Sequence, residues 1–351
     1  MAITFPLDFS LLTPSHFWFF LFGFIIVYAA VGLCIHRPGL LRGVPNRPRT
    51  YFAGIIFIGC LLFIDYFILP AGGLRVGLIA VGLLTIIIGI IDENKNLPAG
   101  TQLIWQIVIA LIAVSWGWTI QYISHPFGAG ILHLDQLAWG NFVFPGSILT
   151  VIWLIFIMNA INWLDGLDGQ APGVGFVTLL TLAAISLLPS IQDPTTISLA
   201  LAGAGCLLAF LLWNFYPARV YLGTQGSWFL GLYIGLVAII GNGKIVTTLL
   251  VLSLPVIDLI YVVILRLVHR QAPWRGDTSR HWHHRLLARG FSPRVIALAA
   301  IIFTALLGLA AVLLQTTEKI FTLFLAAAML ILITGNYAKV SILPFSKKKD
   351  S

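Results

Sequence analysis

Polar residues spaced three apart interrupt the apolar sequence near its middle. The segment NAINWLDGLDG, residues 159–169, follows a long apolar run and supplies Asn159, Asn162, Asp165 and Asp168. Residues at this spacing share a face while a helix lasts. Carboxylates beside lipid are costly, so this face should line a bundle interior or a wet cavity. Two glycines in the segment would let the backbone approach a ligand.

Further polar residues stand at the ends of other apolar runs. Asp92 and Glu93 follow one run, and Asp258 lies inside another. The rest belong to the segments NFYPARVYLGTQGS and DTSRHWHHR, and they are Asn214, Gly223, Thr224, Ser227, Asp277, His281, His283, His284 and Arg285. Carboxylates gathered in one cleft repel each other, and a divalent cation, a basic cluster or a proton would relieve that repulsion.

This set of side chains suits a magnesium ion and a diphosphate. Mg²⁺ prefers oxygen ligands and usually binds through one or two carboxylates plus substrate phosphates. Arginine forks match phosphate oxygens, and histidines donate to phosphate or shuttle protons. A zinc site at the three histidines is disfavoured, because no suitable cysteine or fourth ligand is nearby. The residues therefore predict metal-assisted phosphoryl transfer at the cytoplasmic surface, with one substrate in the membrane.

The elements that must position these residues are apolar helices. The chain has 351 residues, of which 59% are hydrophobic and 9% charged. Each apolar run is close to the ~20 residues that cross a hydrocarbon core, and backbone groups in lipid must bond internally. The alternating segments of a barrel are absent. We therefore predict an all-α integral membrane protein, a polytopic bundle of about ten or eleven transmembrane helices. The candidate spans are 16–35, 51–70, 74–91, 101–120, 144–162, 172–190, 195–213, 227–240, 245–266, 294–314 and 319–341.

The basic residues predict the orientation of the bundle. If the N-terminus is outside, every Lys and Arg falls on the inside except Arg75, Lys244 and Lys319, as the positive-inside rule requires. The polar residues above then all lie at inner helix ends or in inner loops, so the active cleft is expected on the cytoplasmic side. The net charge of +8 is expected from basic residues that set the membrane topology and contact anionic lipid headgroups. It does not indicate nucleic-acid binding, since the basic residues form no folded reading surface.

The chain is predicted to be one polytopic domain over residues 1–351. Its longest polar stretch, the histidine loop 267–293, is too short to build a core of its own. Residues 342–351 form a basic tail that we expect inside. The first span lacks the basic start and cleavage site of a signal peptide, so we expect it to be retained.

The polar segments, taken in order, resemble one family along nearly the whole chain. GIIDENKNLPAGTQLIWQ, NAINWLDGLDGQAPGV, NFYPARVYLGTQGSWFLG, LPVIDLIYVVILRL and DTSRHWHHRLLARGFSPR are similar to segments of the polyprenyl-phosphate N-acetylhexosamine 1-phosphate transferases. That family includes the MraY, WecA and TagO types. The form His-x-His-His-Arg-Leu, with no Phe-Glu after the histidines, looks more like the WecA and TagO branch of glycosyltransferase family 4.

The resemblance implies a UDP-sugar donor, an undecaprenyl-phosphate acceptor, and Mg²⁺ with Mn²⁺ as an alternative. It implies a bacterial plasma membrane protein, UMP as a product, and a homodimer. The catalytic residues would be Asp92, Glu93, Asp165, Asp168, His281, His283 and His284. The substrate-binding residues would be Asn159, Asn162, Asn214, Gly223, Thr224, Ser227, Asp258, Asp277 and Arg285. The metal ligands would be Asp92, Glu93 and Asp165, and either Asp92 or Asp165 would keep the lipid phosphate ionised.

The sequence departs from the family pattern at three places. The aspartate of the family's Gly-Asp-x-Gly-Ser segment, a metal ligand, falls at Thr224, which offers a hydroxyl but no charge. The second acid of the aspartate pair is Glu93, a milder change. The first inner loop, HRPGLLRGVPNRPRTYFAG, matches the family only loosely, with His36 where an acid is usual. Either the remaining acids, Asp92, Glu93, Asp165 and Asp168, hold Mg²⁺ in a shifted geometry, or the chain has reduced, altered or no activity.

Two rival functions remain open from the sequence. A secondary transporter would also place acids within spans, but transporters bind near the midplane and often show internal repeats. Here the acids gather at one side and no repeat is evident, which disfavours transport. A non-catalytic family member that binds nucleotide sugar or partner proteins is the second rival, and Thr224 is the residue that favours it.

Overall fold

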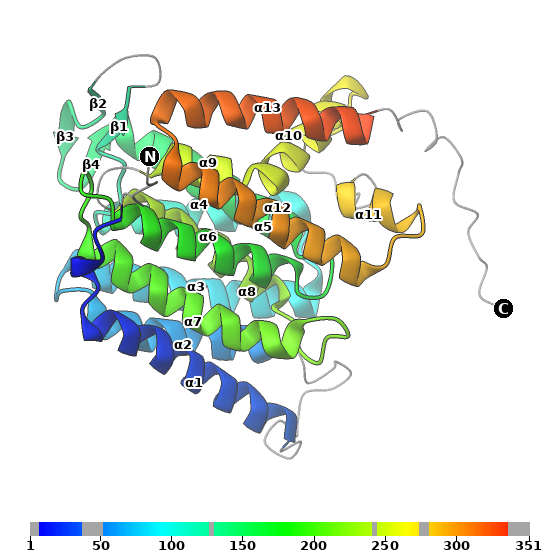
Figure 1. Cartoon of the computed structure of the whole chain (residues 1–351), viewed down its shortest axis with the longest axis horizontal. Coiled ribbons are helices and arrows are strands. Elements are labelled where there is room, and N and C mark those ends of the chain that lie inside the picture. The colour runs from blue at the N-terminus through cyan, green and yellow to red at the C-terminus, as the bar shows by residue number, and fades with distance from the viewer. Residues whose placement is uncertain (1–6, 37–51, 126–129, 241–243, 274–280, 336–351) are drawn as a thin grey trace, which may run out of the picture.

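The computed structural model describes residues 7–36, 52–125, 130–240, 244–273 and 281–335. It is a bundle of roughly parallel and antiparallel helices (Figure 1). A short 3₁₀ helix, η1 (Phe9–Leu11), comes first. The helices that follow it are α1 (Pro14–His36), α2 (Phe52–Ile68), α3 (Gly73–Lys95), α4 (Ala99–Ser115), α5 (Gly146–Leu164) and α6 (Gln170–Ser186). The others are α7 (Pro194–Asn214), α8 (Gly223–Ile239), α9 (Ile245–Val251), α10 (Ser253–Val268), α11 (Trp282–Leu287), α12 (Pro293–Leu313) and α13 (Thr316–Gly335).

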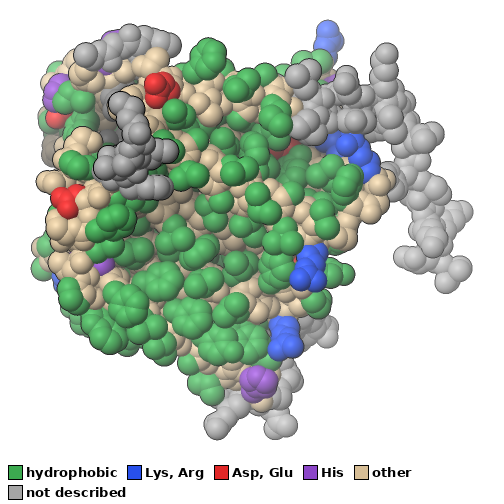
Figure 2. Space-filling model, viewed as in Figure 1, with side chains coloured by type: hydrophobic (Ala, Val, Ile, Leu, Met, Phe, Trp, Pro, Cys, Tyr) green, Lys and Arg blue, Asp and Glu red, His purple; other side chains and the backbone are tan. Residues whose placement is uncertain are grey.

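The predicted all-α polytopic membrane fold is confirmed, and each predicted span overlaps at least one helix. Among the described residues, five helices are long and apolar enough to cross a membrane, namely α1, α3, α5, α7 and α12, and the bent pair α9 and α10 makes a sixth if it counts as one span. Four further apolar helices, α2, α4, α6 and α8, are shorter. Hydrophobic side chains dominate the face shown in Figure 2, and its Lys and Arg side chains lie toward the right-hand end.

The helix α8 occupies the centre of the bundle. All its residues from Gln225 to Ile239 are buried, and it packs against α5, α3, α2 and α6. Its contact with α3 is close enough to require a glycine, because a Cβ on Gly89 would overlap the side chain and backbone of Gln225. This contact fixes the C-terminal end of α3 beside the start of α8.

The ninth predicted span, 245–266, is wrong as a single helix. It is divided at Leu252 into α9 and α10, which meet at an angle of 83°. Pro255 lies in the first turn of α10. A proline removes a backbone donor and clashes with the carbonyl four residues earlier, which accounts for a break just before it. The bend turns α10 toward the end of the bundle where α11 lies.

Two short β-hairpins depart from the all-α expectation. β1 (Tyr122–Ser124) pairs antiparallel with β2 (Ile131–His133), and β3 (Leu137–Trp139) pairs with β4 (Phe142–Phe144). In the register of the second hairpin, Trp139 lies opposite Phe142. Both hairpins lie at the left-hand end of the bundle in Figure 1, and α11 lies at the other.

The predicted histidine loop also contains more structure than expected. Residues 282–287 form the helix α11. Most of the first inner loop, the residue Asp277 and the basic tail 342–351 lie outside the described residues.

Candidate active site

The acidic pair at the end of α3 is held by Thr224 at the start of α8. The Thr224 hydroxyl donates to Oδ2 of Asp92 at 2.8 Å, and its backbone N–H donates to Oε1 of Glu93 at 3.1 Å. The other oxygen of Asp92 accepts from Leu97 N–H at 3.0 Å and from the Gln102 amide at 2.9 Å. The buried carboxylate of Asp92 is therefore satisfied by donors from three parts of the chain.

Gly223 lets the backbone of α8 reach Glu93. Its φ of +67° lies in the left-handed region, and an added Cβ would overlap Glu93 Oε1. Only glycine adopts this conformation without strain and without displacing the carboxylate. The predicted site residues Asp92, Glu93, Gly223 and Thr224 are thus brought together by one helix contact.

The second acidic segment begins where α5 ends. α5 stops at Leu164, so Asp165 follows its last turn and Asp168 lies in the loop. Asp168 Oδ2 accepts from the backbone N–H of Ala218 at 2.9 Å. Burial, with a smaller contribution from the negative charge of Asp168, raises the pKa of Asp165 to about 7. The two carboxyls therefore repel each other across the loop.

Three asparagines of the predicted site form hydrogen bonds with different parts of the chain. Asn214 fixes the acidic loop, accepting from Gly169 N–H at 3.0 Å and donating to the Val220 carbonyl at 2.7 Å. Asn162 accepts from the Ser227 hydroxyl at 2.8 Å and so joins α5 to α8. Asn159 is directed elsewhere, since its amide donates to the Gln106 side chain on α4 at 2.6 Å.

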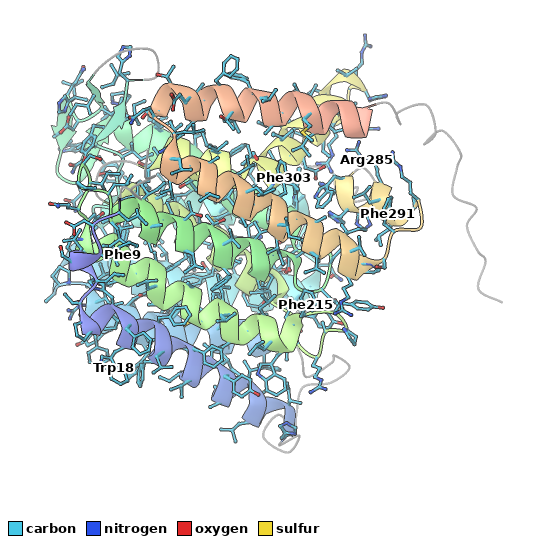
Figure 3. The ribbon with its side chains drawn as sticks, in the orientation of Figure 1. Phe9, Trp18, Phe215, Arg285, Phe291 and Phe303 are labelled. Carbon is cyan, nitrogen blue, oxygen red and sulfur yellow. The ribbon has the colours of Figure 1, made fainter. Side chains whose placement is uncertain are left out.

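A cavity of about 270 Å³ lies between these elements. Its lining consists of Asn162, Asp165, Gly166, Leu167, Asp168, Asn214, Tyr221, Gly223, Thr224 and Ser227. Seven of these are predicted site residues. The cavity thus joins the acidic loop to the start of α8, at the end of the bundle where Figure 3 shows Phe215 and Arg285.

The histidine helix α11 packs against the acidic loop. A Cβ on Gly166 would overlap the His283 ring, so the ring lies directly on this glycine. Burial lowers the pKa of His283 to about 3, with additional effects from His284, His281 and Arg285. Burial likewise lowers the pKa of His284. His283 is therefore neutral near pH 7.

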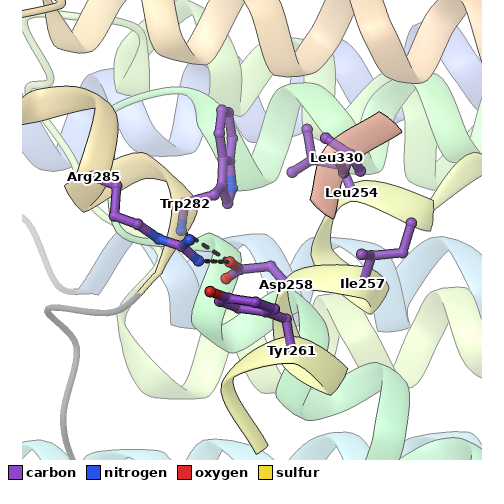
Figure 4. Close-up of a pocket in the computed structure, with 7 residues that line it drawn as sticks. All are labelled: Leu254, Ile257, Asp258, Tyr261, Trp282, Arg285 and Leu330. Carbon is purple, nitrogen blue, oxygen red and sulfur yellow. Dashed lines mark hydrogen bonds and ion pairs between the residues drawn. The ribbon is translucent and has the colours of Figure 1, made fainter. Parts of the chain in front are cut away.

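His281 and Arg285 contact Asp258 on α10. The His281 Nδ1 atom lies 2.7 Å from Asp258 Oδ2, and Arg285 Nη2 lies 3.8 Å from Oδ1. The guanidinium of Arg285 also stacks on the ring of Tyr261, 4.6 Å from its centroid. Figure 4 shows the Arg285 guanidinium and the backbone nitrogen of Trp282 beside the Asp258 carboxylate.

The donor set has room for one hard cation. No group of three or more His, Cys, Asp or Glu side chains within the described ranges is arranged to hold a metal ion. Mg²⁺ needs fewer protein ligands, because water and substrate phosphates complete its coordination. Asp165 and Asp168 fit this requirement, since both line the cavity and their repulsion favours a positive charge between them. Asp92 and Glu93 each already accept from Thr224.

Several contributors to the site were not anticipated from the sequence. Tyr221 and Leu167 line the cavity, and Gln102 bonds Asp92. The Trp163 ring lies edge-on to His281 with centroids 5.0 Å apart. All four fall in the polar segments quoted above. Only Gln102 has an amide side chain that suggests a hydrogen-bonding role, whereas Tyr221, Leu167 and Trp163 are apolar or aromatic residues of ordinary type.

Comparison with known proteins gives consistent matches. Residues 75–242 match the family model described as glycosyl transferase family 4. The "Probable undecaprenyl-phosphate N-acetylglucosaminyl 1-phosphate transferase" of Bacillus subtilis is 32% identical over 264 residues, which cover 73% of this chain and 71% of that protein. The "Decaprenyl-phosphate N-acetylglucosaminephosphotransferase" of Mycobacterium leprae is 27% identical over 358 residues, covering 93% and 78%. A "Phospho-N-acetylmuramoyl-pentapeptide-transferase" of Moorella thermoacetica is 33% identical over 205 residues, covering 58% of each chain.

Proposed function

Because the chain belongs to glycosyl transferase family 4, the polyprenyl-phosphate hexosamine 1-phosphate transferases, we propose that it transfers N-acetylglucosamine 1-phosphate from UDP-N-acetylglucosamine to undecaprenyl phosphate. The chain is an enzyme of the phosphotransferase class. Its relatives support the coarser reaction, the transfer of a hexosamine 1-phosphate from a UDP-sugar to a polyprenyl phosphate. The choice of N-acetylglucosamine rests on the names of the Bacillus and Mycobacterium relatives.

The cavity of about 270 Å³ is the observation that carries this proposal. It is polar, it contains the acids Asp165 and Asp168, and it lies at the end of an apolar helical bundle. A lipid phosphate whose chain stays in the membrane could reach such a position, while a nucleotide sugar enters from water. A purely soluble phosphotransferase would not need a membrane bundle around its site.

The reaction exchanges one phosphoanhydride bond for another. An oxygen of the lipid phosphate forms a bond to the phosphorus next to the sugar. The bond from that phosphorus to the bridging oxygen breaks, and UMP leaves with the bridging oxygen. Phosphoryl transfers of this kind depend mainly on positioning and charge stabilisation.

The residues of the chain would supply positioning and charge. Asn214 holds the acidic loop in shape, and Thr224, which lines the cavity, bonds Asp92 and Glu93. Asp165 and Asp168 would hold Mg²⁺, which when bound would neutralise the diphosphate and make its phosphorus more electrophilic. The histidines of α11 would donate to the phosphate oxygens.

The first experiment measures UMP release by the purified protein in lipid nanodiscs. The reaction contains UDP-N-acetylglucosamine, undecaprenyl phosphate and Mg²⁺. We expect UMP release that requires the lipid, stops on chelation of the metal, and falls at least about 100-fold in Asp165→Asn. The matched control is Asp135→Asn, an exposed acid near the hairpins, which should retain wild-type activity. Nucleotide binding without lipid-dependent UMP release would instead support a non-catalytic relative or another donor sugar.

A further inference from the structure

Asp258 on α10 gathers three donors from the segment that begins α11. Its Oδ2 atom lies 2.7 Å from His281 Nδ1. Its Oδ1 atom accepts from the backbone N–H of Trp282 at 2.9 Å and lies 3.8 Å from Arg285 Nη2. The N–H of Trp282 is one of the first amides of α11, which have no partner within the helix. One carboxylate therefore anchors both the histidine ring and the helix start.

Among the residues that the structure describes, the surroundings of Asp258 leave no space for a substrate group. Its side chain is 8% exposed, and Leu254, Ile257 and Leu330 enclose it together with Trp282 and Tyr261 (Figure 4). The cavity beside it measures about 10 Å³, which is the smallest volume that admits a water molecule. Any effect of Asp258 on the reaction must therefore pass through its partners in the chain.

The ring of His281 is fixed on several sides. Its side chain is 4% exposed, and it packs edge-on to Trp163 and parallel to His283, with centroids 5.0 Å and 5.8 Å away. An ionised carboxylate can only accept a hydrogen bond, so the Nδ1 atom of His281 must carry a proton. The Nε2 atom is then the nitrogen left to act on a ligand.

We propose that Asp258 is a positioning residue of the transferase. It holds His281 in the Nδ1–H form and fixes the start of α11, the helix that places His283 on Gly166 of the acidic loop. This inference rests on the proposed function and adds a residue that touches no substrate. It also gives a role to the bend before α10, which brings Asp258 to the histidine segment.

Asp258→Asn tests the proton position with little change in shape. The Trp282 N–H still requires an acceptor, so the asparagine oxygen should turn toward it. The asparagine NH₂ group then faces His281 Nδ1, which must accept instead of donate. The proton of the neutral ring moves to Nε2, and the charged form of the ring loses its counter-ion.

The direct readout is the ¹⁵N NMR spectrum of the protein labelled only at its histidines. The chain has eight histidines, and the signals missing from His281→Asn identify those of His281. In the wild type we expect Nδ1 of His281 to resonate as a protonated nitrogen. In Asp258→Asn we expect it to resonate as an unprotonated one. Asp193→Asn removes a different structural acid, a helix cap that also binds Lys244, and should leave these signals unchanged.

The second readout is kinetic. We expect Asp258→Asn to lower kcat about 10- to 100-fold, the cost usually seen when a partner that orients a ligating histidine is removed, with little change in the KM for UDP-N-acetylglucosamine. Asparagine at position 281 keeps a donor near the place of Nδ1 but has no Nε2. If Asp258 acts through His281, adding Asp258→Asn to His281→Asn should cost less than about a further twofold in kcat.

Each outcome decides the proposal. An unprotonated Nδ1 in the wild type, or His281 signals that Asp258→Asn leaves unchanged, would overturn it. So would a full, additive loss of kcat in the double variant. If the wild type shows no transferase activity, the proposed function fails, but the NMR comparison still tests the Asp258–His281 pair by itself. If Asp258→Asn does not fold, the wild-type spectrum alone supports or overturns the Nδ1–H form.

Discussion

Thr224 changes the electrostatic character of the acidic pair on α3. The resemblance places an aspartate at this position. The Thr224 hydroxyl lies 2.8 Å from Asp92, and a carboxylate at that distance from Asp92 would require a cation or a proton between the two groups. A hydroxyl donates to Asp92 instead, so the pair is satisfied by the protein alone. The repulsion that a cation could relieve then remains at Asp165 and Asp168. This shifts the expected place of Mg²⁺ toward the acidic loop.

Replacing Thr224 tests this account at a single side chain. In the presence of a chelator, Thr224→Asp should lose about 1–3 kcal/mol of folding free energy, because an acceptor replaces the donor to a buried carboxylate. Thr224→Ser keeps the hydroxyl and should remain close to wild type. The measurement is thermal unfolding with and without Mg²⁺. Equal stability of Thr224→Asp and Thr224→Ser in chelator would contradict the account.

The lowered pKa of His283 predicts that the folding stability of the protein depends on pH. The pKa of this histidine in the folded protein is about 3, below the ordinary value near 6.5, so the unfolded chain binds more protons between these values. Stability is therefore fully present above pH 6.5 and is lost as the pH falls toward 3. Between pH 7.5 and 5 this one group should remove about 2 kcal/mol. Thermal unfolding of His283→Gln should show a shallower pH dependence than the wild type, and identical slopes would refute the neutral, buried imidazole.

At the scale of elements, composition predicted the helices, but packing decided which residues meet. Positions three apart on a helix drift by about 60° per step, since a turn holds 3.6 residues. That drift explains why Asn159 faces Gln106 on α4 while Asn162 faces Ser227 on α8. The break before α10 had a signal in Pro255, but its 83° angle did not. The three-residue strands were too short to show a pattern.

The contact between α3 and α8 can be tested through its glycine. Gly89→Ala places a methyl group against Gln225 and should push the helices apart, at a cost of about 1–3 kcal/mol. The bonds from Thr224 to Asp92 and Glu93 would lengthen, and UMP release should fall at least about tenfold. Gly59→Ala on α2 is the matched control, because nothing lies within 4 Å of its added Cβ. Wild-type activity in Gly89→Ala would show that the site does not depend on this close approach.

The whole molecule has two unlike ends. At one end lie the cavity, α11 and the basic side chains visible in Figure 2. At the other lie the hairpins and the buried ion pair of Lys244 with Asp193, whose atoms are 2.9 Å apart. Burial alone would raise the pKa of Asp193, but the Lys244 ammonium and the bonds from Thr196 lower it. The sequence predicts a basic end of the bundle, because Lys and Arg positions follow topology. It could not predict the cavity, which exists only once α3, α5 and α8 are packed.

Which end faces the cytoplasm is a prediction that cysteine labelling can decide. In a background without the native cysteines, Trp139→Cys introduces a thiol on the second hairpin, where the native side chain is 84% exposed. Ala288→Cys introduces one at the exposed end of α11. A membrane-impermeant maleimide should label Trp139→Cys in intact cells and Ala288→Cys only after permeabilisation, because the basic end should stay inside. The reverse pattern would turn the cavity away from the cytoplasm. A cytosolic nucleotide sugar could not then reach Asp165 and Asp168, so the proposed reaction would fail together with the orientation.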